Sequence, residues 1–173
     1  MLNSWSIPKF LYGVLLIVHV TLIALTLEKL PDPFATHFNT ANEPDRWLSH
    51  KQYWVVQALI SVITPALLVI LLSLSNRLPS YLVNLPNKDY WLHPDRQAET
   101  QQKIIRFGWW MACIIIAFCA GMHYNLVVAN QSETPTLHGR LLLITVGLFI
   151  FAVVFWLKQL HRVFSVPDNH ARV

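Results

Sequence analysis

Four stretches of the chain contain no Asp, Glu, Lys or Arg, and charged residues are gathered between them. These stretches cover residues 10–27, 53–75, 107–129 and 141–157. Each is close to the roughly 20 apolar residues that a helix needs to cross a bilayer, where backbone amides must pair within their own segment. The pattern predicts an all-α integral membrane protein with one domain over residues 1–173. We expect a four-transmembrane-helix bundle with polar loops at 28–52, 76–106 and 130–140.

Composition agrees with this class. Only 13% of the residues are charged, about half of the roughly 25% typical of soluble domains, and 54% are hydrophobic. A soluble enzyme, a nucleic-acid-binding protein and a disordered chain are all disfavoured. The net charge of +4 is attributed to basic residues that flank membrane spans and meet anionic lipid head groups. The expected partner is the lipid bilayer and not nucleic acid.

The distribution of basic residues predicts the orientation of the chain. Nine Lys and Arg residues lie on the side of both termini and the middle loop: Lys9, Arg77, Lys88, Arg96, Lys103, Arg106, Lys158, Arg162 and Arg172. Four lie on the other side: Lys29, Arg46, Lys51 and Arg140. Because basic loops stay in the cytoplasm, we expect an N-in/C-in multi-pass protein with loop 28–52 outside and loop 76–106 inside.

The outer loop between the first two helices has features of an ordered structure. Two proline-containing turns, at 31–33 and 42–45, enclose residues 34–39, whose alternating pattern places Phe34, Thr36 and Phe38 on one face and His37 and Asn39 on the other. This pattern predicts an extended segment folded over the mouth of the bundle. The candidate residues for binding a ligand or partner are Thr36, His37, Asn39, Asp45 and Trp47. Alternatively, these polar groups satisfy one another and only cap the helices.

The inner loop contains a turn flanked by aromatic residues. Its candidate residues are Asn87, Lys88, Tyr90 and Trp91. Beyond Pro94, the spacing of Glu99 and Lys103 predicts an ion pair on a helix that runs into the third span. The basic residues of this loop are interpreted as an anchor for lipid head groups, with a site for a partner protein as the alternative.

Polar residues inside the spans are the intramembrane candidates, because such groups are costly in lipid unless they face other helices. They are His19, Gln57, Ser61, His123 and Asn125. Tyr12 and Thr26, seven residues to either side of His19, extend a polar stripe along the first helix. Two interpretations remain open: hydrogen bonds that hold the helices together, and a proton relay or ligand pocket. In the second span, Pro65 predicts a kink where the carbonyl of Ser61 loses its helical partner.

No pattern indicates a cofactor. Four histidines could gather near the outer surface: His37, His50, His123 and His138. Their spacing is not that of a metal motif, so His37 and His138 stand only as weak metal candidates. Ser132 and His138 lie in one short loop without a nucleophile elbow, which disfavours hydrolytic chemistry.

The loop sequence carries a resemblance. Leu30, Pro31, the run Thr36-His37-Phe38-Asn39, and Pro44, Asp45 and Trp47 resemble the loop signature of a bacterial membrane-protein family of unknown function, related to the N-terminal part of SdpI-type immunity proteins. The resemblance covers about the first 75 residues. Asn42 stands where the family usually has Gly, and the chain lacks the additional spans of SdpI-type proteins. The resemblance implies a bacterial inner-membrane location and protection against a toxic peptide, and it carries no catalytic residues.

Three hypotheses follow. In the first, the protein is a non-enzymatic, SdpI-like protein of the inner membrane that recognises a membrane-protein partner or an envelope-acting peptide through its outer loop. In the second, it is a small transporter or intramembrane enzyme that uses His19 and His123. In the third, it is an accessory subunit of a membrane complex.

Overall fold

The computed structural model describes residues 6–165, and most of them are helical. In chain order the helices are α1 (Ile7–Thr26), α2 (His50–Ala58), α3 (Thr64–Ser73), α4 (Lys88–Trp91), α5 (Gln97–Ala129) and α6 (Gly139–Val163). Four helical segments are long and apolar enough to cross a membrane: Ile7–Lys29, His50–Arg77, Pro94–Ala129 and Gly139–Val163. By length and composition, these segments confirm the prediction of a membrane protein with four spanning helices.

The third span begins earlier than its charge-free window indicates. Helix α5 starts at Gln97, ten residues before position 107, after a 3-10 turn at Pro94–Arg96. The ion pair predicted for its first turns is present, with Lys103 Nζ at 2.7 Å from Glu99 Oε1. A helix can continue beyond the apolar stretch because charged side chains at its end reach polar surroundings, so a window without charges underestimates its length.

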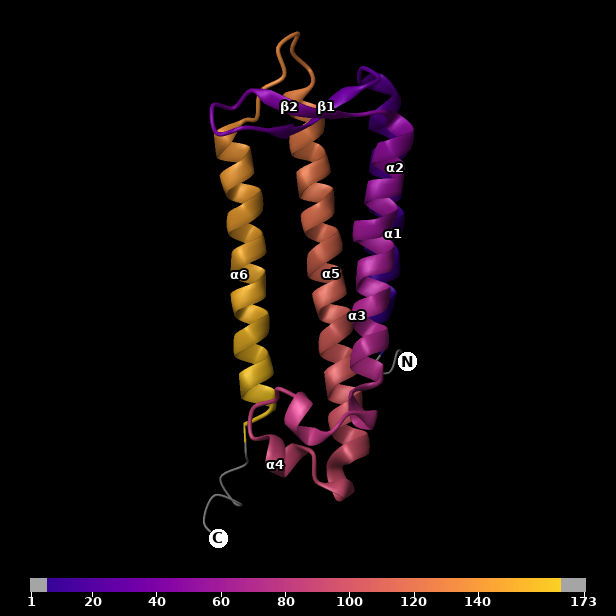
Figure 1. The fold of residues 1–173 in the computed structure, drawn as a ribbon, viewed down its shortest axis with the longest axis vertical. Helices are drawn as coiled ribbons and strands as arrows, with labels where there is room; N and C mark the ends of the chain where they lie inside the picture. The colour runs from indigo at the N-terminus through magenta and orange to yellow at the C-terminus, as the bar shows by residue number, and fades with distance from the viewer. Residues whose placement is uncertain (1–5, 166–173) are drawn as a thin grey trace.

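The chain is not entirely helical, which corrects the all-α prediction. Strands β1 (Phe34–Phe38) and β2 (Pro44–Leu48) form an antiparallel hairpin with two register irregularities. The hairpin lies across one end of the helices (Figure 1). The pattern at residues 34–39 predicted an extended segment, and β1 occupies most of it. We call this end of the molecule the hairpin end and the opposite one the α4 end.

Helix α5 is the centre of the helical arrangement, and α1, α3 and α6 each pack mainly against it (Figure 1). Small residues permit the close contacts. A Cβ atom added to Gly108 would lie 2.7 Å from Leu72 of α3, and one added to Gly121 would lie 2.8 Å from Thr145 of α6. Eleven residues of α5 are buried but none of α6. The fold is therefore three helical segments around α5, not a closed ring of four.

The second span changes its winding near Pro65. A π-helical turn, Leu59–Ile63, separates α2 from α3. Pro65 cannot donate to the carbonyl of Ser61, and Tyr12 Oη of α1 donates to that oxygen instead, at 2.6 Å. Thr64 Oγ1 donates to the carbonyl of Leu59 at 3.0 Å. The disturbed backbone is thus paired again by hydroxyl groups, as membrane interiors require.

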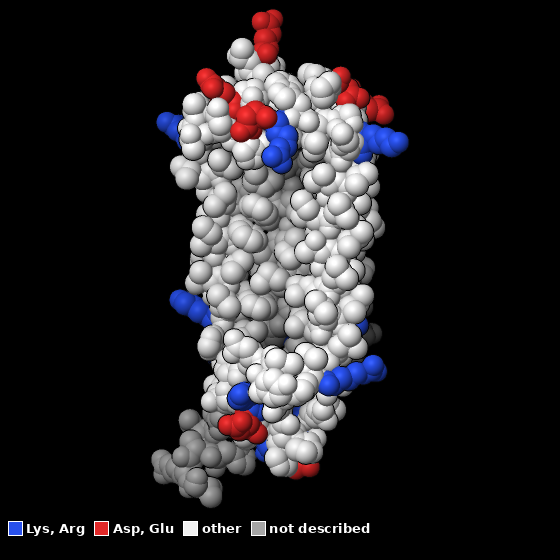
Figure 2. All heavy atoms as spheres, in the orientation of Figure 1, with Lys and Arg blue, Asp and Glu red and all other residues white. Residues whose placement is uncertain are grey.

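Charged residues lie mainly at the two ends of the molecule, and the α4 end has more basic residues than the hairpin end. Figure 2 shows Lys, Arg, Asp and Glu concentrated at the ends, with most of the side between them free of such residues. Within residues 6–165, eight of the Lys and Arg residues lie in the elements of the α4 end and four at the hairpin end; Arg172, counted above, lies outside the described residues. Many large apolar side chains on the helices are exposed, as expected for helices surrounded by lipid.

Candidate functional site

A buried polar cluster connects α1, α2 and α5 in the membrane-spanning region. His19 Nε2 lies 3.1 Å from Gln57 Oε1, and Thr26 Oγ1 lies 2.8 Å from His123 Nε2. With Tyr12, which bonds the second span, every member of the predicted polar stripe on α1 contacts another helix. These contacts are hydrogen bonds between helices, as in the first of the two interpretations of the stripe.

The partners of His123 define its tautomer. Thr26 Oγ1 donates its proton to the carbonyl of Leu22 at 2.6 Å, so it accepts from His123 Nε2–H. His123 Nδ1 then accepts from the hydroxyl of Tyr53 at 2.9 Å. Both ring nitrogens are used by a neutral imidazole. Tyr53, which is 2% exposed, was not among the predicted intramembrane residues. Its spacing of four residues from Gln57 was the signal in the sequence that could have identified it.

His19 is the exception in this cluster. Its Nε2 donates to Gln57, because an amide oxygen only accepts, and its buried Nδ1 has no hydrogen-bond partner. The rings of His19 and His123 meet edge to face with their centroids 6.3 Å apart. Asn125 does not join the cluster: its Nδ2 donates to Gly121 O and to Thr145 Oγ1 of α6.

The residues proposed for the outer loop lie on the hairpin. His37 Nδ1 lies 2.5 Å from Asp45 Oδ1, and both side chains are substantially exposed, at 61% and 44%. Trp47 is also exposed. Asn39 accepts two backbone N–H bonds in the turn, and Thr36 Oγ1 donates to the carbonyl of Arg46 at 3.4 Å. Asn39 and Thr36 thus stabilise the hairpin, whereas His37, Asp45 and Trp47 are displayed to the outside.

Two asparagine side chains hold the hairpin on the helices, and we call Asn42 and Asn130 the amide clamp. Asn130, which follows α5, accepts from Ala35 N and donates to Ala35 O, both at 2.9 Å. Asn42 in the hairpin turn donates to Leu137 O at 3.1 Å and accepts from Leu137 N at 2.9 Å. Asn42 has φ of 62°, the left-handed conformation that Asn tolerates. The sequence pattern indicates only a turn at Asn42 and gives no signal for Asn130.

The inner-loop residues close the α4 end. Asn87 Nδ2 and Trp91 Nε1 both donate to the carbonyl of Phe164, at 2.8 and 2.9 Å, just after the last residue of α6. Tyr90 packs edge to face on Trp91, and Lys88 is exposed at the start of α4. Helix α4 therefore caps α6, a role that accounts for the aromatic residues of this motif.

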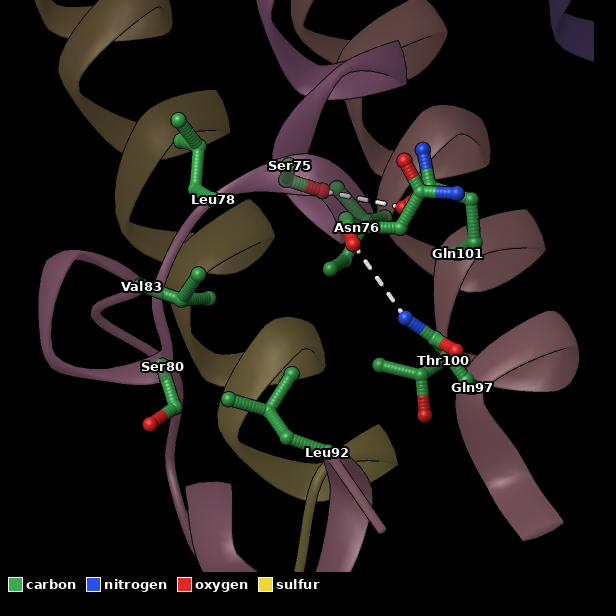
Figure 3. Close-up of a pocket in the computed structure, with 10 residues that line it drawn as sticks. Ser75, Asn76, Leu78, Ser80, Val83, Leu92, Gln97, Thr100 and Gln101 are labelled. Atoms are coloured by element: carbon green, nitrogen blue, oxygen red, sulfur yellow. Dashed lines mark hydrogen bonds between the residues drawn. The ribbon is translucent and has the colours of Figure 1, made fainter. Parts of the chain in front are cut away.

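A small pocket lies beside this cap, between the end of α3 and the start of α5. Its volume is about 90 Å³, and Figure 3 shows Ser75 bonded to Gln101 and Gln97 reaching the carbonyl of Asn76. This is smaller than the roughly 150 Å³ of a cavity that holds benzene, and it suits a few water molecules.

The weak metal candidates are not brought together with further ligands. Within residues 6–165, no three His, Cys, Asp or Glu side chains are placed to share an ion. His37 bonds to Asp45, and His138 immediately precedes α6.

Parts of this chain are similar in sequence to known proteins. Residues 14–61 match the family model "Domain of unknown function (DUF1648)". This stretch includes most of α1, the whole hairpin and α2, and therefore His19, Thr26, Tyr53 and Gln57. An uncharacterized protein of Archaeoglobus fulgidus is 28% identical over 144 residues, which cover 79% of this chain and 78% of that protein. No solved structure matches. Both matches are of unknown function, one a domain and the other an uncharacterized protein.

Proposed function

We propose that the protein is a non-enzymatic membrane protein that recognises a partner through the exposed face of its hairpin. The observation that carries this proposal is the amide clamp, which holds His37, Asp45 and Trp47 in fixed positions outside the helices. A surface that is already ordered loses little conformational entropy on binding. Exposed Trp and Arg side chains, here Trp47 and Arg46, are the types that dominate binding energy in many interfaces.

The orientation and the class of partner belong to the same proposal. The excess of basic residues at the α4 end favours a cytoplasmic location for that end, which directs the hairpin away from the cytosol. From there it would meet an envelope-acting peptide or the external part of another membrane protein. The resemblance to SdpI-type immunity proteins suggests the peptide, and a bacterial inner membrane is the corresponding location.

The experiment compares a strain that lacks the gene with strains that carry variants, exposed to a panel of membrane-active peptides. We expect the deletion to change sensitivity to at least one peptide, and Trp47→Ala with Asp45→Asn to reproduce that change. Trp54→Ala is the matched control, because Trp54 is similarly exposed but lies on α2, outside the hairpin. Equal amounts of protein in the membrane must be verified.

Two results would count against this proposal. If the deletion leaves sensitivity unchanged across the panel, an envelope-acting peptide is not the partner. If the hairpin variants fully complement the deletion, the exposed face of the hairpin is not the recognition surface. The orientation is tested separately by Thr40→Cys in the exposed hairpin turn, labelled with a membrane-impermeant maleimide. Cys113 and Cys119 are buried, so the new thiol supplies the signal.

A transporter or intramembrane enzyme is the second candidate, and one atom favours it: the buried Nδ1 of His19 is free to accept a proton or a ligand hydrogen bond. Reconstituted vesicles should then show a proton flux that His19→Leu removes. Equal fluxes in vesicles with and without the protein would reject a proton pathway.

A further inference from the structure

Helices α5 and α6 are separated by a long apolar groove. Its larger part, toward the α4 end, has a volume of about 740 Å³ and is lined chiefly by Phe107, Trp110, Ile114, Ala152, Phe155 and Trp156. A second part of about 380 Å³ continues toward the hairpin end and shares Trp110, Ile114 and Ala152 with the first. Figure 2 shows the side of the molecule hollowed between the two ends, where α5 and α6 lie in Figure 1. We call this the α5/α6 groove.

The groove is maintained by a few contacts at separate levels. Trp156 Nε1 donates to the carbonyl of Phe107 at 3.0 Å, and the rings of Phe118 and Phe149 stack with centroids 4.4 Å apart. Between such contacts α6 stands away from α5, and none of its residues is buried. Empty apolar space is unfavourable because the atoms that line it lose dispersion contacts. In a bilayer, the molecules available to fill an open groove are lipid chains.

The α4 end of the groove carries positive charge. Lys103 and Arg106 both line it there. Beyond Lys103, a polar hollow of about 390 Å³ is lined by Arg96, Arg162 and Glu99 among others. Among the charged residues that line these two spaces, four are basic and Glu99 alone is acidic.

Lys103 is also held in place. Its Nζ pairs with Glu99 at 2.7 Å and lies 3.9 Å from the ring centroid of Trp91. An apolar channel that ends at an ordered cationic rim matches an amphiphile with an anionic head.

We propose that the α5/α6 groove binds a phospholipid with an anionic headgroup. One acyl chain lies along the apolar lining, and the phosphate rests at Lys103 and Arg106. Basic pockets between spanning helices are suited to such head groups, and the volume falls within the roughly 300–1,000 Å³ of typical ligand sites. This proposal does not depend on recognition by the hairpin, because its residues lie on different elements and at the other end of the molecule.

The test uses the full-length protein purified in detergent and exposed to an equimolar mixture of phosphatidylglycerol and phosphatidylcholine with identical chains. Retained lipid is measured by native mass spectrometry. We expect phosphatidylglycerol to be retained preferentially. The preference should fall about fivefold for each charge removed in Lys103→Gln and Arg106→Gln, from the energy of one basic side chain near an anionic lipid. Lys158→Gln is the control, because Lys158 is exposed on α6 and does not line the groove.

A second pair of variants tests the acyl chain. Ala152→Phe should fill the groove where its two parts meet and reduce retention of both lipids, whereas Val154→Phe places the same aromatic side chain at an exposed position outside the lining. Inorganic phosphate alone should not displace the lipid.

Three results would overturn the proposal: equal retention of the two phospholipids, loss of the lipid to inorganic phosphate, or a second protein chain in place of lipid. If the charge variants fold poorly, the Ala152→Phe comparison still decides whether the groove is occupied.

Discussion

Helix α5 presents two different interfaces to its neighbours. Toward α1 and α2 it is closed: His123 bonds to Thr26 and Tyr53, and Ile23 of α1 is fully buried. Toward α6 it is open, with no α6 residue buried and a long groove between the helices. Both interfaces lie in the same span, so the surrounding solvent does not explain the difference.

The difference reflects what holds helices together in lipid. Burial of apolar side chains provides little driving force there, because lipid tails are as apolar as Leu, and association depends on close packing and interhelical hydrogen bonds. Toward α1 and α2, His123 of α5 bonds to Thr26 and Tyr53, and Cys113 Sγ donates to the carbonyl of Pro8 at 3.4 Å. The α6 interface has close packing at Gly121 and hydrogen bonds at Asn125 and Trp156, with aromatic contacts between them. Where neither is present, the helices separate.

The largest effect is expected from His123→Leu. This change leaves the buried hydroxyl of Tyr53 without its acceptor and the partly buried Thr26 hydroxyl without its donor. Unfolding in a titration with denaturing detergent should show a loss of about 2 kcal/mol, because buried polar groups without partners are costly. His138→Leu is the control, since His138 is exposed before α6. Equal losses in the two variants would contradict the importance of the closed interface.

A smaller effect is expected from Gly121→Ala. The new methyl group would lie 2.8 Å from Thr145 Cγ2, and a β-branched side chain on a helix has little freedom to move away. Relative to Gly147→Ala, where nothing lies within 4 Å of the added atom, the variant should lose about 1 kcal/mol through overpacking. The same titration measures both. A neutral result at Gly121 would mean that α6 can move outward without cost.

The sequence predicted the spans well and the contacts between them poorly. Charge-free windows identify helices because a bilayer excludes charge, and alternation at residues 34–39 indicated the extended segment. The stripe of Tyr12, His19 and Thr26 showed which face of α1 meets other helices. The windows could not show that α5 is central, because helix order depends on packing between distant residues.

The amide clamp could not be predicted from the sequence for the same reason. Asn130 and Ala35 are separated by 95 residues, as are Asn42 and Leu137, and no local pattern relates them. In the inner loop, the sequence indicated only that Trp91 is an aromatic residue near a turn. Its role as a donor to Phe164 appears only when α4 is placed beside the end of α6.

The smallest effect is expected from Thr145→Val, which changes the open interface with little change in shape. Asn125 Nδ2 loses one acceptor at 2.9 Å but retains the carbonyl of Gly121 at 2.8 Å, so the loss should be about 0.6 kcal/mol, the average for interhelical bonds in membranes. Thr26→Val is the matched change in the closed interface. It removes the hydroxyl that accepts from His123 Nε2–H at 2.8 Å, in a cluster that also holds Tyr53, and should cost more in the same titration. If the two valine variants are equally destabilised, the two interfaces of α5 do not differ in the way their hydrogen bonds indicate, and the open groove must be explained by packing alone.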